Sequence, residues 1–340
     1  MPRMIYNGTK SFEAPELSAR PWPQVHGTRP VLEIGIVNNM PDSALIATER
    51  QFTTLVQTAA AGRPVRIKYF SLPSVPRSTE ALDKMRGVYR GLAELESSSL
   101  DALIITGTEP KATKLQDEPY WDEFRALVDW AADNTKSTIF SCLAAHGAVL
   151  HMDRIQRHRL REKCSGVFEG EILSDHPLLD GFTGPLQICH SRWNTLDAGE
   201  LSRAGYRMLT QSIFAGVDTF AKNVGSDFIF YHGHPEYDEA SLLKEYRRDV
   251  ARFLNREIEA YPAMHTNYFN TKLEKQLRAF RDKAEKQERY GDLDSFPELA
   301  PRPGLAQDIG ATADRLYRNW INRLFEQVFR NTAFLPLKGA

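Results

Sequence analysis

Cys142 stands between an apolar segment and a run of small residues, a pattern that can present a nucleophile. Ser137–Ser141 before it suit a buried strand, and Leu143 to Gly147 after it suit a helix. Such a sharp turn would lift the sulfur out of a sheet and bring the N–H groups of the first helical turn close to it. Those groups could stabilise a thiolate or a developing oxyanion. A cysteine at the end of a buried strand can also be an unreactive core residue. Only a base elsewhere in the chain can decide between this interpretation and a nucleophile.

A candidate base follows the apolar segment Asp227–Tyr231, in the sequence His232-Gly233-His234-Pro235-Glu236. In a His-x-Glu arrangement the carboxylate can hold one ring nitrogen and leave the other to face a thiol. We therefore predict His234 as the base and Glu236 as the group that orients it. The alternative is a core histidine followed by a carboxylate at a helix start. His232 is interpreted as a core residue, and no metal site is predicted, because no third ligand can be placed.

The elements that must position these groups alternate between strands and helices. The pattern predicts strands at about 31–37, 65–70, 100–107, 137–142 and 227–231, and helices at about 45–60, 79–96 and 120–134. This alternation is typical of an α/β protein with a mostly parallel sheet covered by helices on both faces. Ligands of such sheets bind at the carboxyl ends of the strands, where Cys142 and the Gly107 loop both fall.

Shorter strands are predicted at 166–173, 186–191 and 213–217, which makes the second half of the sheet partly antiparallel. A charged helix is expected over 271–290. A last helix over about 313–330 carries an apolar stripe that would dock on the sheet or on a second subunit.

Composition bounds the class of protein. The 340 residues are 42% hydrophobic and 26% charged, which excludes a disordered or fibrous chain, and the formal net charge of -1 argues against nucleic acid or anionic membrane as a partner. The 3 cysteines lack CxxC spacing and predict neither a disulfide framework nor a zinc site. With no apolar leader or spanning segment in the sequence, a cytoplasmic location is expected.

A resemblance to a known family emerges from motifs that occur in a fixed order. They resemble those of the homoserine O-succinyltransferases of the MetA type, in the class I glutamine amidotransferase-like superfamily, from about Val31 to Phe329. The motifs are Asn39-Met40-Pro41, Ile104-Ile105-Thr106-Gly107, Tyr120-Trp121, Glu162-Lys163-Cys164-Ser165-Gly166-Val167-Phe168, His190-Ser191-Arg192, Gly233-His234-Pro235-Glu236-Tyr237-Asp238, Glu245-Tyr246-Arg247-Arg248-Asp249 and Asn319-Trp320.

The resemblance implies a flavodoxin-like catalytic unit over 31–260, after an irregular extension over 1–30 and before a C-terminal helical segment over 261–340. It implies transfer of an acyl group from succinyl-CoA or acetyl-CoA to L-homoserine, a step of methionine synthesis. The route would be ping-pong through a Cys-His-Glu triad, with no bound cofactor and in a homodimer. Carried over by motif, Lys163, Ser191 and Arg248 would contact substrate, with Arg248 on the amino-acid carboxylate.

Three departures from the family pattern concern specificity. Asp42-Ser43 stands where the family has lysine, and Leu143 to His146 differ at the elbow, which alters the lining of the acyl site. The third lies in the loop that begins at Gly107, which together with Leu143 is the candidate oxyanion region. Where the family discriminates acyl donors, this loop carries Lys111, which would attract the free carboxylate of a succinyl group. Glu109, two residues earlier, is the other candidate for that role.

The sequence leaves several functions open. The leading hypothesis is a homoserine O-acyltransferase that favours succinyl-CoA over acetyl-CoA. A serine O-acyltransferase on the same scaffold is an alternative, because a difference of one methylene changes binding by only about 1–3 kcal/mol. A glutamine amidotransferase would use the same triad but commonly has Gly-x-Cys-x-Gly, where this chain has Phe140-Ser141-Cys142-Leu143-Ala144. A binding module without activity is a further alternative.

Overall fold

The computed structural model describes residues 31–286 and 293–329. The extension predicted over 1–30 lies outside the described residues, as does the end of the helix predicted over 271–290. The part that is described contains the elements on either side of Cys142 and His234.

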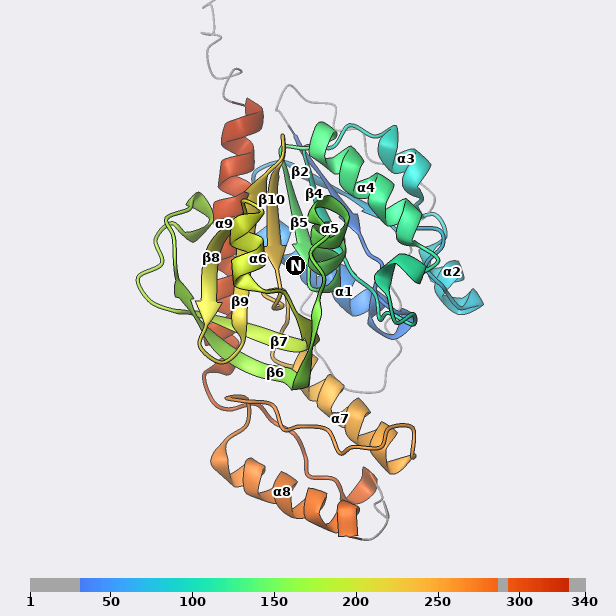
Figure 1. Ribbon diagram of the computed structural model, residues 1–340, viewed down its shortest axis with the longest axis vertical. Helices are drawn as coiled ribbons and strands as arrows, with labels where there is room; N and C mark the ends of the chain where they lie inside the picture. The colour runs from blue at the N-terminus through green and yellow to red at the C-terminus, as the bar shows by residue number, and fades with distance from the viewer. Residues whose placement is uncertain (1–30, 287–292, 330–340) are drawn as a thin grey trace, which may run out of the picture.

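A ten-stranded sheet forms the centre of the described molecule, in the order β3-β2-β1-β4-β5-β10-β9-β8-β6-β7 (Figure 1). The pairs from β3 to β10 are parallel, and the pairs from β10 to β7 are antiparallel. The strands are β1 (Leu32–Val37), β2 (Val65–Phe70), β3 (Tyr89–Arg90), β4 (Ala102–Thr106), β5 (Ser137–Ser141), β6 (His158–Ile172), β7 (Leu186–Thr195), β8 (Arg207–Ser212), β9 (Gly216–Asn223) and β10 (Asp227–Tyr231).

Helices cover both faces of the sheet, as expected for strands such as β4 and β5 in which every residue is buried. The α-helices are α1 (Asp42–Ala60), α2 (Thr79–Met85), α3 (Leu92–Glu96), α4 (Trp121–Asn134), α5 (Leu143–Asp153), α6 (Ala198–Arg203), α7 (Ser241–Leu254), α8 (Thr271–Lys286) and α9 (Leu305–Phe329); short 3-10 turns lie at Leu115–Asp117, Pro177–Leu179 and Leu293–Ser295. One core cluster joins the sheet to α4, α5 and α6, and a second joins the opposite face to α1 and α9.

The last helix docks on the sheet rather than projecting from it. Trp320 of α9 is 1% exposed, and its indole Nε1 donates to Ser137 Oγ of β5 at 2.9 Å. Arg323, one turn later, pairs with Asp227 of β10 at 2.7 Å. The apolar stripe predicted on this helix therefore packs on the same chain, and α9 spans the back of the two strands that carry Cys142 and His234.

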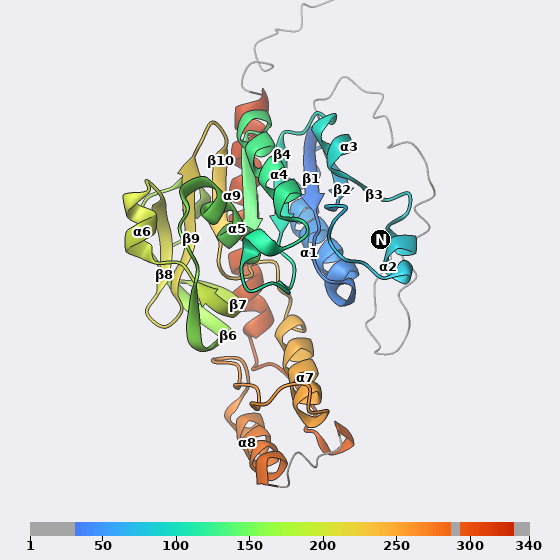
Figure 2. The same cartoon turned by 45° about the vertical axis from the view of Figure 1, so that its right-hand side comes forward.

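A third core cluster lies below the sheet, where α7 and α8 pack together (Figure 2). It includes the segment around Tyr268 and reaches the sheet through Val167 of β6 and Cys189 of β7. The predicted boundary at residue 260 runs inside this cluster. The helices of this layer approach the sheet at the carboxyl edge of the parallel strands, beside the candidate site (Figure 1).

The mostly parallel α/β architecture is confirmed, and two local predictions are wrong. The helix predicted over 79–96 is two short helices with the edge strand β3 between them, because the chain turns at Gly87 with φ +79°. The strand predicted over 213–217 is mainly the turn between β8 and β9. Ile213 and Phe214 are 81% and 86% exposed, and Gly216 has φ +74°, which favours a turn over a central strand.

Candidate active site

Cys142 occupies a strained elbow between β5 and α5. Its backbone has φ +50° and ψ −108°, a conformation that residues other than glycine rarely adopt. The elbow is fixed on both sides, because Cys142 N–H donates to the Tyr231 carbonyl of β10 at 2.7 Å and the Ala145 N–H donates to the Cys142 carbonyl at 3.0 Å. Cys142 is a partly exposed residue at the start of α5, and it forms no disulfide. This is the arrangement predicted from the sequence around Cys142.

The loop after β10 places His234 beside this elbow. Tyr231 of β10 pairs with Ser141 of β5 in parallel register, so the residues that follow both strands leave the sheet at the same edge. The His234 N–H donates to the Cys189 carbonyl of β7 at 2.7 Å. At Gly233, a Cβ would lie 2.4 Å from Ile188 and 2.8 Å from Asp218, so only glycine lets the loop pass this closely over β7 and β9.

His234 and Glu236 form a buried pair that faces Cys142. The Nδ1 atom of His234 lies 2.8 Å from Glu236 Oε1, and both side chains are less than a tenth exposed. Burial by itself would lower the pKa of His234, but the facing Cys142 and the Glu236 carboxylate raise it well above its usual value, and a hydrogen bond links the ring to Cys142. Glu236 contacts Nδ1 of His234, so the other ring nitrogen, Nε2, is the one that forms the hydrogen bond with Cys142.

Two further side chains, Ser141 and Tyr237, contact the His234–Glu236 pair. Ser141 Oγ donates to Glu236 Oε1 at 3.2 Å, and the ring of Tyr237 stacks on His234 with centroids 4.2 Å apart. The second oxygen of Glu236 is buried without a partner among the described residues, as are the hydroxyls of Tyr231 and Tyr317. The Glu236 charge acts on both of these hydroxyls, so α9 contributes to the electrostatic surroundings of the triad through Tyr317.

The Gly107 loop closes against the elbow. A Cβ on Gly107 would lie 2.4 Å from Leu143 Cβ and 3.0 Å from the Ala144 nitrogen, so the loop and the first turn of α5 are in direct contact. Asn39, after β1, holds the loop in place, because its N–H donates to Thr106 Oγ1 at 2.9 Å and its side-chain amide donates to the Thr106 carbonyl at 3.2 Å. Backbone groups of the loop and of the first turn of α5 thus meet directly after Cys142.

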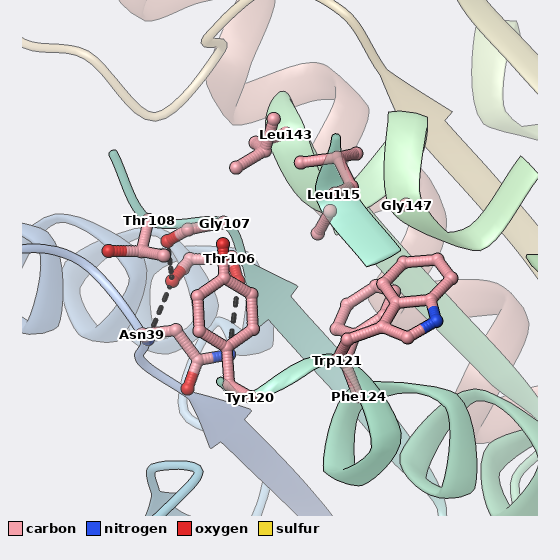
Figure 3. Close-up of a pocket in the computed structure, with 11 residues that line it drawn as sticks. Asn39, Thr106, Gly107, Thr108, Leu115, Tyr120, Trp121, Phe124, Leu143 and Gly147 are labelled. Carbon is pink, nitrogen blue, oxygen red and sulfur yellow. Dashed lines mark hydrogen bonds between the residues drawn. The ribbon is translucent and has the colours of Figure 1, made fainter. Parts of the chain in front are cut away.

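A pocket opens at the start of α5, between this loop, α4 and α5. Figure 3 shows its lining, with Tyr120 beside Asn39 and Thr106 on one side and with Trp121, Phe124 and Gly147 on the other. The side chains are mostly apolar. The exception among the large ones is Tyr120, whose buried hydroxyl has no hydrogen-bond partner among the described residues. The lining of the pocket includes Leu143 and Ala144, the two residues that directly follow Cys142.

The three residues carried over as substrate contacts meet in one network. Lys163 of β6 pairs with Asp249 at 3.1 Å and with Glu245 at 3.5 Å, both on α7. Ser191 of β7 donates to Glu245, and Arg248 pairs with Asp249 at 2.8 Å. The Arg248 side chain is 52% exposed, so part of its guanidinium faces solvent.

Tyr237, Glu245 and Asp249 belong to the family motifs, but the sequence alone predicted no role for them. Tyr237 connects this network to the triad, because its hydroxyl donates to Glu245 Oε1 at 2.7 Å while its ring stacks on His234. Burial alone would raise the pKa of Glu245, but Lys163 and the donors from Ser191 and Tyr237 lower it, so this buried carboxylate is ionised. The sequence did contain one signal for this network: Glu245 and Asp249 are four residues apart, so they lie on the same face of a helix.

The residues predicted to select the acyl donor do not enter the pocket. Lys111 and Glu109 are exposed, and neither lines the cavity beside Leu143. Burial would lower the pKa of Arg248, but the charges of Asp249, Glu245 and, less strongly, Glu109 raise it. The backbone N–H groups of Lys111 and Ala112 both donate to the buried Glu118 at 2.6 Å, which fixes the loop that carries them.

Two other departures from the family pattern have structural positions. Asp42 begins α1, where it accepts from Ser78 N–H at 2.8 Å and pairs with Arg77 at 3.3 Å. His146 is buried and stacks on His232 with centroids 4.7 Å apart, and it does not line the pocket beside Leu143. Burial lowers the pKa of His232 to about 3, which agrees with its interpretation as a core histidine.

The remaining cysteines have a different environment from Cys142. Cys189 is buried, and burial raises the pKa of its thiol and that of Cys164. In the part of the chain that the structure describes, no cluster of three or more His, Cys, Asp or Glu side chains has the arrangement of a metal site. None of the helices described there is long and apolar enough to cross a membrane.

The architecture and this site together define a class I glutamine amidotransferase-like fold, with a cysteine on a strand–helix elbow and a histidine–glutamate pair at the next parallel strand. Among solved structures, the chain is similar to a glutamine amido transferase from Methylobacillus flagellatus, with a TM-score of 0.48, 13% identity and coverage of 86% of this chain and 94% of that one.

The family is shown by sequence. The family model for homoserine O-succinyltransferase matches residues 24–330. A homoserine O-succinyltransferase from Rhodopseudomonas palustris is 51% identical over 86% of this chain and 87% of its own length. Another from Bradyrhizobium japonicum is 43% identical over 94% of this chain and 98% of its own. The chain belongs to the homoserine O-succinyltransferase family, which confirms the resemblance seen in its motifs.

Proposed function

We propose that this chain transfers a succinyl group from succinyl-CoA to the hydroxyl of L-homoserine, in methionine biosynthesis, through an acyl-enzyme on Cys142. The observation that carries the proposal is the contact of Cys142 with the His234–Glu236 pair, in a chain of the homoserine O-succinyltransferase family. The acyl-CoA is a co-substrate, and no bound cofactor takes part in the mechanism.

In the first half-reaction, His234 takes the thiol proton and the Cys142 sulfur attacks the thioester carbonyl. The raised pKa of His234 favours this transfer, because the ring is stable as a cation between the thiolate and Glu236. The tetrahedral intermediate then breaks its bond to the CoA sulfur. CoA leaves as a thiol after it takes the proton from His234, and the acyl group stays on Cys142.

The negative oxygen of that intermediate needs hydrogen-bond donors. We assign this role to backbone N–H groups of Leu143 and of the Gly107 loop, because both segments meet at the elbow and the start of a helix favours negative charge. The strained Cys142 backbone supports the assignment, since this residue directly precedes the first turn of α5 and its N–H groups.

In the second half-reaction, His234 removes the proton from the acceptor hydroxyl, and the resulting oxygen attacks the Cys142 thioester. Collapse of the intermediate forms the ester and releases the Cys142 sulfur. We propose that the Lys163, Ser191 and Arg248 network orients the acceptor, with the exposed part of Arg248 on its carboxylate. Tyr237 connects this network to the base, because its hydroxyl donates to Glu245 and its ring stacks on His234. The same side chain would therefore help to position both the acceptor and the base.

Steady-state kinetics test the reaction and separate it from its alternatives. CoA release is measured with succinyl-CoA or acetyl-CoA as donor and with L-homoserine or L-serine as acceptor, and ammonia release is measured with L-glutamine. The proposal predicts the highest kcat/KM for succinyl-CoA with L-homoserine. A higher value with L-serine would indicate the serine O-acyltransferase, and ammonia release without acyl transfer would indicate a glutaminase.

The homodimer implied by the family resemblance stays a prediction. Light scattering of the purified chain measures it directly, because a monomer has a mass of 38.6 kDa and a dimer has twice that mass. The expected cytoplasmic location is tested by cell fractionation.

A further inference from the structure

A concentrated group of cations lies where the chain leads from α5 into β6. Residues 154–163 contain five basic residues and a single acidic one, Glu162, in a chain whose formal net charge is -1. Three of the basic residues are exposed, so this part of the surface presents positive charge to solvent. Such a surface attracts a ligand that carries several negative charges. The exposed residues are Arg154, Arg159 and Arg161.

Arg159 and Arg161 form no ion pair in the part of the chain that the structure describes. The exposed Glu162 lies on the same segment but pairs with neither of them. Glu200 approaches this segment only at His158, where the two side chains are 3.8 Å apart. No carboxylate described in the structure therefore competes with a ligand for these two guanidinium groups.

The cations closer to the triad already belong to the proposed acceptor network. Lys163 is held by Glu245 at 3.5 Å and by Asp249 at 3.1 Å, and Arg248 pairs with Asp249 at 2.8 Å. A second and larger anion would have to displace these carboxylates. The arginines at the start of β6 can bind such an anion without that loss.

An exposed aromatic ring lies beside these arginines on the neighbouring strand. Trp193 of β7 is 43% exposed, and the Arg159 Cζ atom lies 4.8 Å from the centre of its ring. The pairing of β6 with β7 shifts between Arg159 and Cys164, so residues 160–163 bulge opposite Trp193. A bulge of this kind redirects side chains at the edge of a sheet, and here it carries Arg161.

Strand β7 connects this surface to the triad. The Cys189 carbonyl accepts from the His234 N–H at 2.7 Å, and Ser191 donates to Glu245 of the acceptor network. Cys189, Ser191 and Trp193 are alternate residues of the strand, so they lie on one face of it. At about 3.3 Å per residue, Trp193 lies about 13 Å along the strand from Cys189. A long ligand on this face can reach from the base to the arginines.

We propose that Arg159, Arg161 and Trp193 bind the nucleotide end of the acyl-CoA donor. The proposal rests on the proposed function and locates the part of the donor that does not react. CoA carries a diphosphate and a further ribose phosphate at the far end of its pantetheine arm, so these charges must bind at a distance from Cys142. The guanidinium groups would donate to phosphate oxygens, and the adenine would stack on the indole.

The kinetic test compares succinyl-CoA with S-succinyl-pantetheine, which has the same thioester but lacks the nucleotide. The full-length chain is assayed as wild type and as Arg159→Met, Arg161→Met and Trp193→Ala. We expect each arginine variant to raise KM for succinyl-CoA by about 5- to 10-fold and Trp193→Ala to raise it by about tenfold, with kcat unchanged. None of them should change kcat/KM for S-succinyl-pantetheine. Arg86→Met is the matched control, because this arginine is 81% exposed and lies between α2 and β3, at the opposite edge of the sheet from β7.

A binding measurement separates the subsite from the reaction. Isothermal titration calorimetry with CoA itself should show weaker binding in the three variants by the same factors, and no change in Arg86→Met. Added salt should weaken CoA binding to the wild type more than to a variant that combines Arg159→Met and Arg161→Met, because salt screens charged contacts. A wild type that binds CoA in this way but transfers no succinyl group to L-homoserine would contradict the proposed function and leave the subsite in place.

The remaining outcomes overturn the subsite. Equal kcat/KM of the wild type for both donors would mean that the nucleotide contributes no binding. Equal losses with both donors in the variants would indicate a structural role of the bulge. Unchanged KM and Kd in the variants would mean that the nucleotide binds elsewhere. If their mass in light scattering also differed from that of the wild type, the surface would be a contact with a second copy of the chain.

Discussion

The proton on His234 is the central feature at the scale of single residues. Burial alone would favour a neutral ring, but Cys142 on one side and Glu236 on the other raise the pKa of His234 well above its usual value. The ring therefore stays protonated to higher pH than an ordinary histidine when it faces the thiolate. Because CoA would take this proton in the proposed mechanism, the alkaline limb of the acylation rate should report the loss of the His234 proton.

Glu236→Gln removes one of the two charges that hold this proton and keeps an oxygen that can accept from His234 Nδ1. We expect the pKa of His234 to fall, which moves the alkaline limb of kcat/KM for succinyl-CoA to lower pH. Histidine NMR titration and a pH–rate profile measure the two effects. Glu80→Gln, on the exposed face of α2, should leave both curves in place. A limb that stays at the wild-type pH in Glu236→Gln would contradict the role of the carboxylate.

At the scale of elements, the parallel strands bring the triad together at one edge. Cys142 follows β5 and His234 follows β10, and the two strands pair directly. The sequence was sufficient to predict this because each residue comes directly after an apolar strand. It was not sufficient for the contacts between β6 and α7, since Lys163 meets Glu245 and Asp249 across 82 and 86 residues of chain. Such pairs leave no periodic pattern in a single sequence.

The antiparallel part of the sheet was also hard to predict, for a different physical reason. β8 and β9 bury Thr210, Asp218 and Thr219, which interrupt the apolar pattern of a central strand. These polar groups are satisfied inside the fold, because Thr210 and Thr219 both donate to Asp218, which also pairs with His190 at 3.2 Å. Burial opposes ionisation, yet these partners lower the pKa of Asp218 to about 2. The partners become visible only in three dimensions.

The contact between the Gly107 loop and α5 gives a prediction at this scale. In Gly107→Ala the new Cβ would meet Leu143 Cβ at 2.4 Å, so the loop or the elbow must move. We expect kcat to fall by about 100-fold, because a displacement near 1 Å at reacting groups has an effect of that order. Gly184→Ala is the matched control, since nothing lies within 4 Å of its Cβ position. Equal activity of the two variants would argue against an oxyanion site at this contact.

At the scale of the whole molecule, α9 closes the face of the sheet behind the site. It packs against α1 and β7 and bonds to β5 through Trp320. The helix thereby links the end of the described chain to the strands that carry the triad. The layer of α7 and α8 lies at the carboxyl edge of the parallel strands, where the network of Lys163, Ser191 and Arg248 meets α7. Both C-terminal layers therefore contribute to the geometry of one site.

Trp320→Ala tests the contribution of α9 to stability. Removing this buried indole should lower the free energy of unfolding by about 3–5 kcal/mol, as for other large aromatic side chains in cores. Urea denaturation measures the change. Trp193→Ala is the control, because Trp193 is 43% exposed and should contribute much less. A loss in Trp320→Ala no greater than that in Trp193→Ala would mean that α9 is not part of the cooperative core.

The acyl-enzyme on Cys142 is the central claim, and intact-protein mass spectrometry tests it most directly. The chain is incubated with succinyl-CoA without acceptor, then digested to locate the modification. The account predicts one added succinyl group, located on Cys142, absent in Cys142→Ala and removed when L-homoserine is added. A wild-type chain that turns over succinyl-CoA and L-homoserine with no label on Cys142, or a fully active Cys142→Ala variant, would contradict it.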